Sequence, residues 1–170
     1  MSVDSANAVY TSLTEKELQK LVQLAEGKDV VELGAQYGGS TIALALSARS
    51  VHSCDWHQGD EHAGYRDTLH DYFYNIVSCR NVVSHIGRFE DILPKLRRGG
   101  FQMAFIDGQH DFVSVTADYK LVKPLLAEGA VVAFHDYGRF QVEEAVQRLF
   151  GAPDELVDTL AIVRETDGDS

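Results

Sequence analysis

Short apolar runs alternate with longer amphipathic stretches over most of the chain. Five runs are rich in β-branched or aromatic residues and are bounded by glycine or polar residues, a pattern that predicts buried strands. They are Asp29–Leu33, Val51–Asp55, Val82–Ile86, Phe101–Asp107 and Ala130–His135. Other stretches carry apolar residues at spacings of three and four, which predicts helices over 65–76, 112–126 and 142–150.

A further helix is predicted before the first strand. Thr14 and Glu17 form a capping box, and Leu13 and Leu18 stand where a hydrophobic staple would fix the start of the helix. The helix should end near Gly27, because glycine readily takes the left-handed conformation that closes a helix.

Strands separated by helices predict a doubly wound α/β fold: a mostly parallel sheet with helices on both faces. Each parallel connection must cross over the sheet in the same right-handed sense, which places the helices there. We expect a single domain over residues 1–170. Its ends, 1–12 and 165–170, are expected to be flexible, and the apolar stretch Leu156–Arg164 to add one or two final strands.

Residues with useful chemistry close each predicted strand. In a doubly wound sheet, ligands bind beyond the carboxyl ends of the strands, where the strand order reverses. The segments at those ends are Glu32–Gly34, Asp55–His57, Gly87–Arg88, Asp107–His110 and His135–Asp136. We therefore expect the functional site to be assembled from these five segments.

The first strand runs into a glycine turn and a helix start, with Gly34, Gly38 and Gly39. Glycines let a ligand approach the backbone, and a helix N-terminus offers free N–H groups. Asp55 ends the next strand, where a carboxylate can accept hydrogen bonds from ribose hydroxyls. Together these features favour a nucleoside site over a plain tight turn. NAD is one such ligand, but its fingerprint requires glycine at position 36, which is Gln36.

The charge of the chain narrows the class of ligand. Its 170 residues carry 15 Lys+Arg against 26 Asp+Glu, a formal net charge of -11, which disfavours nucleic acid and anionic lipid as partners. No apolar run approaches the roughly 20 residues that span a bilayer, and no basic region of a secretory signal begins the sequence.

Cys54 and Cys79 lack a zinc spacing and are expected to be reduced, with Cys54 buried. We expect a cytoplasmic protein that acts on a small molecule.

Four ordered motifs resemble those of class I S-adenosylmethionine-dependent methyltransferases. They are Glu32–Ser40, Gly87–Pro94, Phe105–His110 and the stretch from Leu125 to Asp136. The sequence is similar to the catechol and caffeoyl-CoA O-methyltransferases and to the antibiotic-tailoring branch that includes macrocin O-methyltransferase. The resemblance covers residues 28 to 150 approximately. It implies a Rossmann-like fold, S-adenosylmethionine as cofactor and O-methylation of a small molecule.

The resemblance also implies roles in cofactor binding. Glu32 would fix the methionyl end, directly or through water, while the three loop glycines let the cofactor lie against the backbone. Asp55 would hold the ribose. Trp56 would either stack on adenine or lie in the core under the sheet edge. The residues that would border the adenine edge are Gly87, Arg88 and Phe89. Arg88 stands where the family has a small residue, so its side chain is given no role.

A metal site is implied at the ends of the fourth and fifth strands. In metal-dependent members of the family three ligands come from these positions, which are here Asp107, His135 and Asp136; Asp107 would also border the cofactor. The cation would hold the acceptor oxygen and lower its pKa. A histidine stands where the commonest site of the family has an oxygen ligand, so Mn, Fe or Zn would suit it better than Mg. Otherwise His135 would donate to a neighbouring carbonyl as an ordinary buried histidine.

His110 stands three residues after Asp107, where the catechol-type pattern has a lysine that serves as general base. A histidine titrates near neutrality and would take the proton of the acceptor. Asp107 is predicted as the second catalytic residue. The alternative for His110 is a residue that only caps or packs at a helix start.

Two other functions remain consistent with the sequence. One is a non-catalytic S-adenosylmethionine-binding domain that acts with a partner chain, because no long insertion is present to cover an acceptor. The other is an NAD-binding oxidoreductase. A homo-oligomer, or the segment Trp56–Gly64, would supply the missing wall of an acceptor pocket.

Overall fold

The computed structural model describes residues 6, 8–59 and 64–165. Within these residues, seven strands form one sheet. They are β1 (Asp29–Leu33), β2 (Ser50–Asp55), β3 (Val82–Ile86), β4 (Phe101–Ile106), β5 (Leu126–Phe134), β6 (Glu155–Val157) and β7 (Leu160–Arg164). Their spatial order is β3-β2-β1-β4-β5-β7-β6, with β1 to β5 parallel and β7 antiparallel to both of its neighbours.

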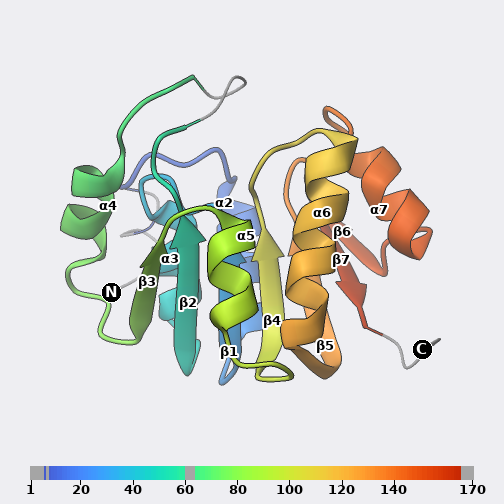
Figure 1. Cartoon of the computed structure of the whole chain (residues 1–170), viewed down its shortest axis with the longest axis horizontal. Coiled ribbons are helices and arrows are strands. Elements are labelled where there is room, and N and C mark those ends of the chain that lie inside the picture. The colour runs from blue at the N-terminus through green and yellow to red at the C-terminus, as the bar shows by residue number, and fades with distance from the viewer. Residues whose placement is uncertain (1–5, 7, 60–63, 166–170) are drawn as a thin grey trace.

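Helices cover both faces of this sheet (Figure 1). One face carries α2 (Glu15–Ala25), α3 (Gly39–Ala45) and α4 (Leu69–Ile76). The other carries α5 (Phe89–Ile92), η1 (Leu93–Lys95), α6 (Phe112–Val122), η2 (Lys123–Leu125) and α7 (Val142–Phe150), where η marks a 3-10 turn. The predicted doubly wound α/β fold is confirmed.

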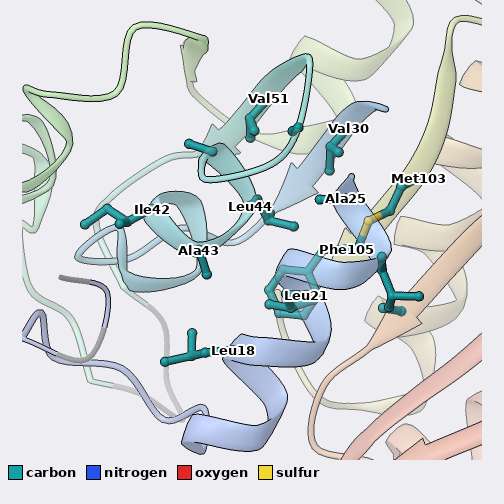
Figure 2. Close-up of a cluster of buried hydrophobic side chains, with 14 of the residues drawn as sticks. Leu18, Leu21, Ala25, Val30, Ile42, Ala43, Leu44, Val51, Met103 and Phe105 are labelled. Carbon is teal, nitrogen blue, oxygen red and sulfur yellow. The ribbon is translucent and has the colours of Figure 1, made fainter. Parts of the chain in front are cut away.

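The central strands send alternate side chains into two separate hydrophobic clusters. In β1, Val30 joins the cluster under α2 and α3, and Val31 joins the cluster under α6 and α7; in β4, Met103 and Ala104 divide in the same way. Successive side chains of a strand point to opposite faces, so a strand covered on both faces reads as a continuous apolar run. Figure 2 shows the first cluster, where side chains of α2 and α3 gather with those of β1, β2 and β4.

Most predicted boundaries are confirmed, and the exceptions have physical reasons. The capping box forms as predicted: the backbone N–H of Thr14 donates to Glu17 Oε2 at 2.7 Å, and that of Glu17 donates to Thr14 Oγ1 at 3.2 Å. The prediction that β3 is a buried strand is wrong. It lies at the edge of the sheet, paired on one side only, and Val83 and Ile86 are nearly half exposed. The helix predicted from residue 65 begins only with α4.

The chain just before α2 packs onto the molecule. The ring of Tyr10 meets that of Tyr37 edge-on, with centroids 5.6 Å apart, and the backbone N–H of Leu13 donates to Thr11 Oγ1 at 3.2 Å. The expected flexibility of residues 1–12 stays a prediction. Within that segment Ala6 is buried, and residues 1–5 and 7 lie outside the described residues.

The C-terminal stretch forms both of the final strands, β6 and β7, that the apolar pattern had left as one or two. The backbone N–H of Glu165 donates to the carbonyl of Ala130 at 2.8 Å, and the expected flexibility of 165–170 stays a prediction. Residues 166–170 lie outside the described part of the chain.

Candidate functional site

A cleft of about 840 Å³ opens at the carboxyl edge of the sheet. The strand order reverses between β1 and β4, which is where doubly wound folds bind their ligands. Segments that follow all five parallel strands line this cleft, together with residues 10–12. The predicted site residues that line it are Gly34, Gly39, Asp55, Trp56, Gly87, Arg88, Phe89, Asp107, His110 and Asp136. Those that do not are Glu32, Gly38 and His135.

Two glycines of the loop after β1 allow close packing. Gly34 has a φ of +92°, and a Cβ there would collide with the backbone carbonyl of Asp107. Gly38 has a φ of +91° at the N-cap of α3, and a Cβ there would lie 2.9 Å from the side chain of Ile76. Gly38 thus packs against α4 and is not among the residues that line the cleft.

Glu32 lies behind the cleft. Ser40 Oγ donates to its Oε1 and Thr41 Oγ1 to its Oε2, both at 2.6 Å. The side chain is fully buried, and burial raises its pKa to about 7 because a low-dielectric surrounding disfavours the carboxylate. Glu32 is not among the residues that line the cleft, so of its two predicted routes to the cofactor this position favours the indirect one. Glu32 instead holds the first turn of α3, of which Ser40 lines the cleft.

Asp55 organises the glycine loop through its carboxylate. Its Oδ2 accepts hydrogen bonds from the backbone N–H groups of Ala35 and Gln36, both at 2.8 Å, and its Oδ1 accepts one from His57 at 2.7 Å. Gln36 has a φ of 47°, a left-handed conformation that is uncommon for a residue with a side chain. A carboxylate oxygen can accept more than one hydrogen bond, so Oδ1 keeps capacity for a ligand hydroxyl at the cleft surface.

Trp56 and Arg88 form a wall of the cleft where β2 and β3 end. Trp56 is half-buried and lines the cleft, so the alternative of a core tryptophan is wrong. The guanidinium of Arg88 lies 4.5 Å from the centroid of the indole, a cation–π contact. Arg88 therefore covers one face of Trp56, and a ligand ring could stack only on the other.

Four side chains meet at the ends of β4 and β5: Asp107, His110, His135 and Asp136, with one donor atom of each within 4.8 Å of the others. His135 Nδ1 lies 3.1 Å from Asp107 Oδ1, and His110 Nε2 lies 3.2 Å from Asp136 Oδ2. We call this group the Asp–His cluster. It unites the three predicted metal ligands and adds the predicted base. Two carboxylates and two imidazoles are a suitable donor set for a divalent transition metal. The same four groups also neutralise one another when both imidazoles are protonated.

The charges in the Asp–His cluster shift its pKa values. Burial by itself lowers the pKa of His135, but the carboxylate of Asp107 and its other acidic neighbours outweigh burial and raise it to about 10. Burial by itself raises the pKa of Asp107, but His135 and His110 hold it well below its usual range. The pKa of His110 is raised because Asp107 and Asp136 outweigh its burial. The cluster thus behaves as one coupled network.

His110 is not the cap of α6. That position is taken by Asp111, whose carboxylate accepts from the backbone N–H groups of Val113 and Ser114. The imidazole of His110 keeps 22% of its side-chain surface exposed at the cleft, and its ring lies 5.3 Å from that of Phe140. The capping alternative is therefore wrong, and His110 faces the cleft.

Sequence reasoning missed that Glu17 supports this site. Its side chain is fully buried, and its Oε2 lies 3.6 Å from His135 Nε2, an atom with no hydrogen-bond partner among the described residues. Oε1 accepts hydrogen bonds from the backbone N–H and the hydroxyl of Thr159, at 2.7 and 2.8 Å. Burial by itself raises the pKa of Glu17, but His135, Thr14 and Thr159 together lower it to about 2. No local pattern joins Glu17 to His135 or to Thr159, because each of the two lies more than 100 positions further along the chain.

Asp118 was also missed. It belongs to α6, lines the cleft and is only 8% exposed. The signal was present in the sequence: Asp118 stands three residues after Val115 and four before Val122, on the apolar stripe of its helix. An acidic residue at a core-facing position is uncommon without a partner or a function.

None of the helices in the described part of the chain has the length and apolar character needed to span a bilayer. Cys54 and Cys79 are both buried, and neither forms a disulfide bond in the described structure; burial was predicted for Cys54.

Comparison with known proteins gives a family match. The model of a family described as a methyltransferase domain matches residues 31–137. A curated relative, the uncharacterized protein y4gI of Sinorhizobium fredii, is 28% identical over 127 residues. That alignment covers 68% of this chain and 14% of the relative, so the chain spans only a small part of that protein.

Solved structures share the fold. The O-methyltransferase TomG from Streptomyces achromogenes, involved in tomaymycin synthesis and solved in complex with SAM, has a TM-score of 0.63 and 23% identity, covering 86% of this chain and 63% of that one. The O-methyltransferase NovP has a TM-score of 0.73 and 21% identity, covering 92% of this chain and 82% of that one. At these identities the likeness concerns the fold, and it confirms the class I methyltransferase architecture that the motifs implied.

Proposed function

Because the chain belongs to the methyltransferase domain family, we propose that it binds S-adenosylmethionine in the cleft and transfers the methyl group to an oxygen of a small molecule. One observation carries this proposal: the glycine loop after β1 and three members of the Asp–His cluster, Asp107, His110 and Asp136, line the same cleft. A cofactor that lies on the loop then presents its sulfonium methyl to groups able to handle a proton. TomG and NovP, two O-methyltransferases of this fold, support oxygen as the acceptor atom, and TomG supports the cofactor.

The reaction is an in-line displacement at the methyl carbon. A lone pair of the acceptor oxygen forms the new bond to this carbon, the carbon–sulfur bond breaks, and its electron pair stays on sulfur. In this proposal Nε2 of neutral His110 receives the proton of the acceptor hydroxyl. The carboxylates of Asp107 and Asp136, at 3.4 and 3.2 Å from this nitrogen, stabilise the imidazolium that forms. No covalent intermediate is required. The remaining rate acceleration would come from holding the acceptor oxygen in line with the methyl carbon and the sulfur.

Cofactor binding would fall to the other residues of the cleft. Gly34 and Gly39 would let the cofactor lie against the loop, Asp55 would accept a hydrogen bond from the ribose, and Trp56 would offer its uncovered face to a ring. The residues that would border the adenine are Gly87, Arg88 and Phe89. Glu32 and Gly38 would act indirectly, by holding α3 and its N-cap in place.

A divalent metal fits the Asp–His cluster. Asp107, His135 and Asp136 would hold the ion, His135 through Nδ1, the nitrogen that faces Asp107. A bound ion would fix the acceptor oxygen and lower its pKa. Since a histidine is among the ligands, Mn, Fe or Zn is expected to bind more tightly than Mg.

We also propose a cytoplasmic setting and a homo-oligomer. Two buried cysteines that form no disulfide bond in the described structure suit a reducing compartment. A second copy would cover the open side of the cleft and complete the pocket for the acceptor.

The first prediction concerns the ligand. Isothermal titration calorimetry and thermal unfolding should show binding of S-adenosylhomocysteine, with no response to NAD. At a ligand concentration of 100 times Kd, binding to the folded state alone adds about 2.7 kcal/mol to the free energy of unfolding. A Mn titration should give a separate stabilisation. Binding of NAD without binding of S-adenosylhomocysteine would contradict the proposal and favour an oxidoreductase.

A turnover assay distinguishes an enzyme from a non-catalytic binding domain. Release of S-adenosylhomocysteine is measured with a panel of phenolic and sugar hydroxyl acceptors, for the wild type and for His110→Ala. Turnover that falls by about 100-fold or more in the variant while cofactor affinity stays unchanged supports the base. Cofactor binding without turnover on any acceptor would favour the non-catalytic domain.

A further inference from the structure

Asp118 is a buried acid that the proposed reaction does not use. It is more than nine-tenths buried and lines the cleft, and no described residue donates a hydrogen bond to it or forms an ion pair with it. Burial, followed by the charges of Glu90 and Asp111, raises its pKa to about 7. Every one of these influences opposes ionisation, and no cation compensates. A buried carboxyl left in this state is costly for the fold, which indicates that a ligand supplies the missing donor.

The surroundings of Asp118 describe the ligand group that fits. A Cβ on Gly108 would lie 2.8 Å from Asp118 Oδ2 and 3.0 Å from the ring of Phe89. The carboxyl and the aromatic ring therefore converge on one stretch of bare backbone. Ala117 and Leu121, from the same helix as Asp118, line the cleft beside them. This part of the cleft is a slot lined by apolar side chains and by the buried carboxyl of Asp118, and Glu90 and Ser114 also line the cleft.

Among the parts of S-adenosylmethionine, only adenine matches such a slot. It has flat apolar faces and an exocyclic amino group that donates hydrogen bonds. The ribose carries several hydroxyls, and the methionyl group carries charges that an apolar slot would leave without solvation. We propose that Asp118 accepts a hydrogen bond from the 6-amino group of adenine and thereby selects adenine among purines. This inference rests on the proposed cofactor and adds a specificity-determining residue to its site.

The selection has a simple physical basis. In the hypoxanthine ring of an inosyl analogue, a carbonyl oxygen replaces the amino group. Above pH 7, where the carboxyl of Asp118 is ionised, two acceptors would then face each other, so the analogue is bound more weakly. A site built to hydrogen-bond one group discriminates strongly against a ligand that lacks it.

The test compares S-adenosylhomocysteine with S-inosylhomocysteine by calorimetry at about pH 8.5, above the raised pKa of Asp118, so that its carboxyl is ionised. The wild type should bind the adenosyl compound at least about tenfold more tightly. In Asp118→Asn, which has the same shape, the amide can both accept and donate, so this preference should fall below about threefold. The matched control is Asp111→Asn. It removes the same charge from the start of the same helix, retains an N-cap and does not line the cleft, so its preference should equal that of the wild type.

Each other outcome has a definite meaning. An undiminished preference in Asp118→Asn overturns the inference. A loss of preference in Glu90→Gln alone also overturns it, because recognition of the amino group would then belong to the exposed carboxylate of Glu90 at that edge of the cleft. If the wild type binds neither compound, the proposed cofactor itself is wrong. Should Asp118→Asn fail to fold, a crystal structure of the wild type with S-adenosylhomocysteine decides: the amino group must lie about 3 Å from a carboxyl oxygen of Asp118.

Discussion

At the scale of single residues, the same carboxyl group is set to different charge states by its hydrogen-bond donors. Glu17 and Glu32 are both fully buried glutamates. Glu17 receives backbone and hydroxyl donors and lies near His135, so its pKa falls to about 2 and it remains charged. Burial raises the pKa of Glu32 to about 7, because its two hydroxyl donors do not offset burial and no cation lies beside it in the described structure. Donor number and nearby charge decide between these states.

The raised pKa of Glu32 predicts a stability that depends on pH. Between its ordinary value of 4.5 and about 7, the folded state holds a proton that the unfolded state has released. The free energy of unfolding therefore decreases as pH rises through this window. The Gln of Glu32→Gln does not ionise, so this variant does not share the decrease. Its free energy of unfolding relative to the wild type should therefore improve by roughly 3 kcal/mol between pH 4.5 and pH 8. Urea unfolding of both proteins at the two pH values measures the change. A difference that does not vary with pH would show that Glu32 ionises normally.

At the scale of elements, the loop after β1 and the loop after β4 act as one unit. Gly34 lies against the backbone of Asp107, and the backbone N–H of Asp107 donates to the carbonyl of Leu33 at 2.8 Å. The cofactor side of the cleft is thereby placed relative to the Asp–His cluster by backbone contacts. Backbone groups are more rigid than side chains, which suits a reaction that depends on position.

Gly34→Ala should separate these two loops. A Cβ there collides with backbone that cannot rotate away, in a conformation that L-residues rarely adopt. We expect a loss of more than about 3 kcal/mol in the free energy of unfolding, measured in urea, and weaker binding of S-adenosylhomocysteine. The control is Gly27→Ala. Gly27 also has a positive φ but has open space around it, so this variant should lose only about 1 kcal/mol. Equal losses in both variants would show that the conformation, and not the contact, makes Gly34 necessary.

At the scale of the whole molecule, the two ends of the described chain meet behind the Asp–His cluster. Glu17 of α2 accepts hydrogen bonds from both the backbone N–H and the hydroxyl of Thr159, which lies in the turn between β6 and β7. The backbone N–H of Tyr137, just after the cluster, donates to the carbonyl of Thr159 at 2.8 Å. These residues lie in part outside the matched family segment, 31–137, yet they support its site.

Thr159→Val tests this link. The change removes the hydroxyl that donates to a charged, buried carboxylate, so the free energy of unfolding should fall by about 1.5 to 3 kcal/mol. Thr116→Val is the matched control, because the hydroxyl of Thr116 is buried without a hydrogen-bond partner in the described structure. Its removal should be neutral or stabilising. Chemical unfolding of both variants at neutral pH gives the comparison, and equal effects would contradict a specific role for the Thr159 hydroxyl.

The sequence alone determined the parallel sheet and the place of the site. Val30 and Val31 read as one apolar run because β1 is covered on both faces, and Asp55, Asp107 and Asp136 could be placed together because parallel strands end at the same edge. Burial of Glu32 could not be predicted in the same way, because strand position alone does not say whether a side chain at the end of a strand faces the cleft or the helix behind it.

Only the tertiary structure decided which distant groups meet. It placed Glu17 at 3.6 Å from His135, brought His110 into the Asp–His cluster and turned Asp118 into the cleft. Local patterns report the period of an element and the face that it buries. They do not report which side chains of two elements face each other, since this depends on how the helices pack against the sheet. The charge states of the site follow from those meetings, because burial and nearby charge, and not residue type alone, set a pKa.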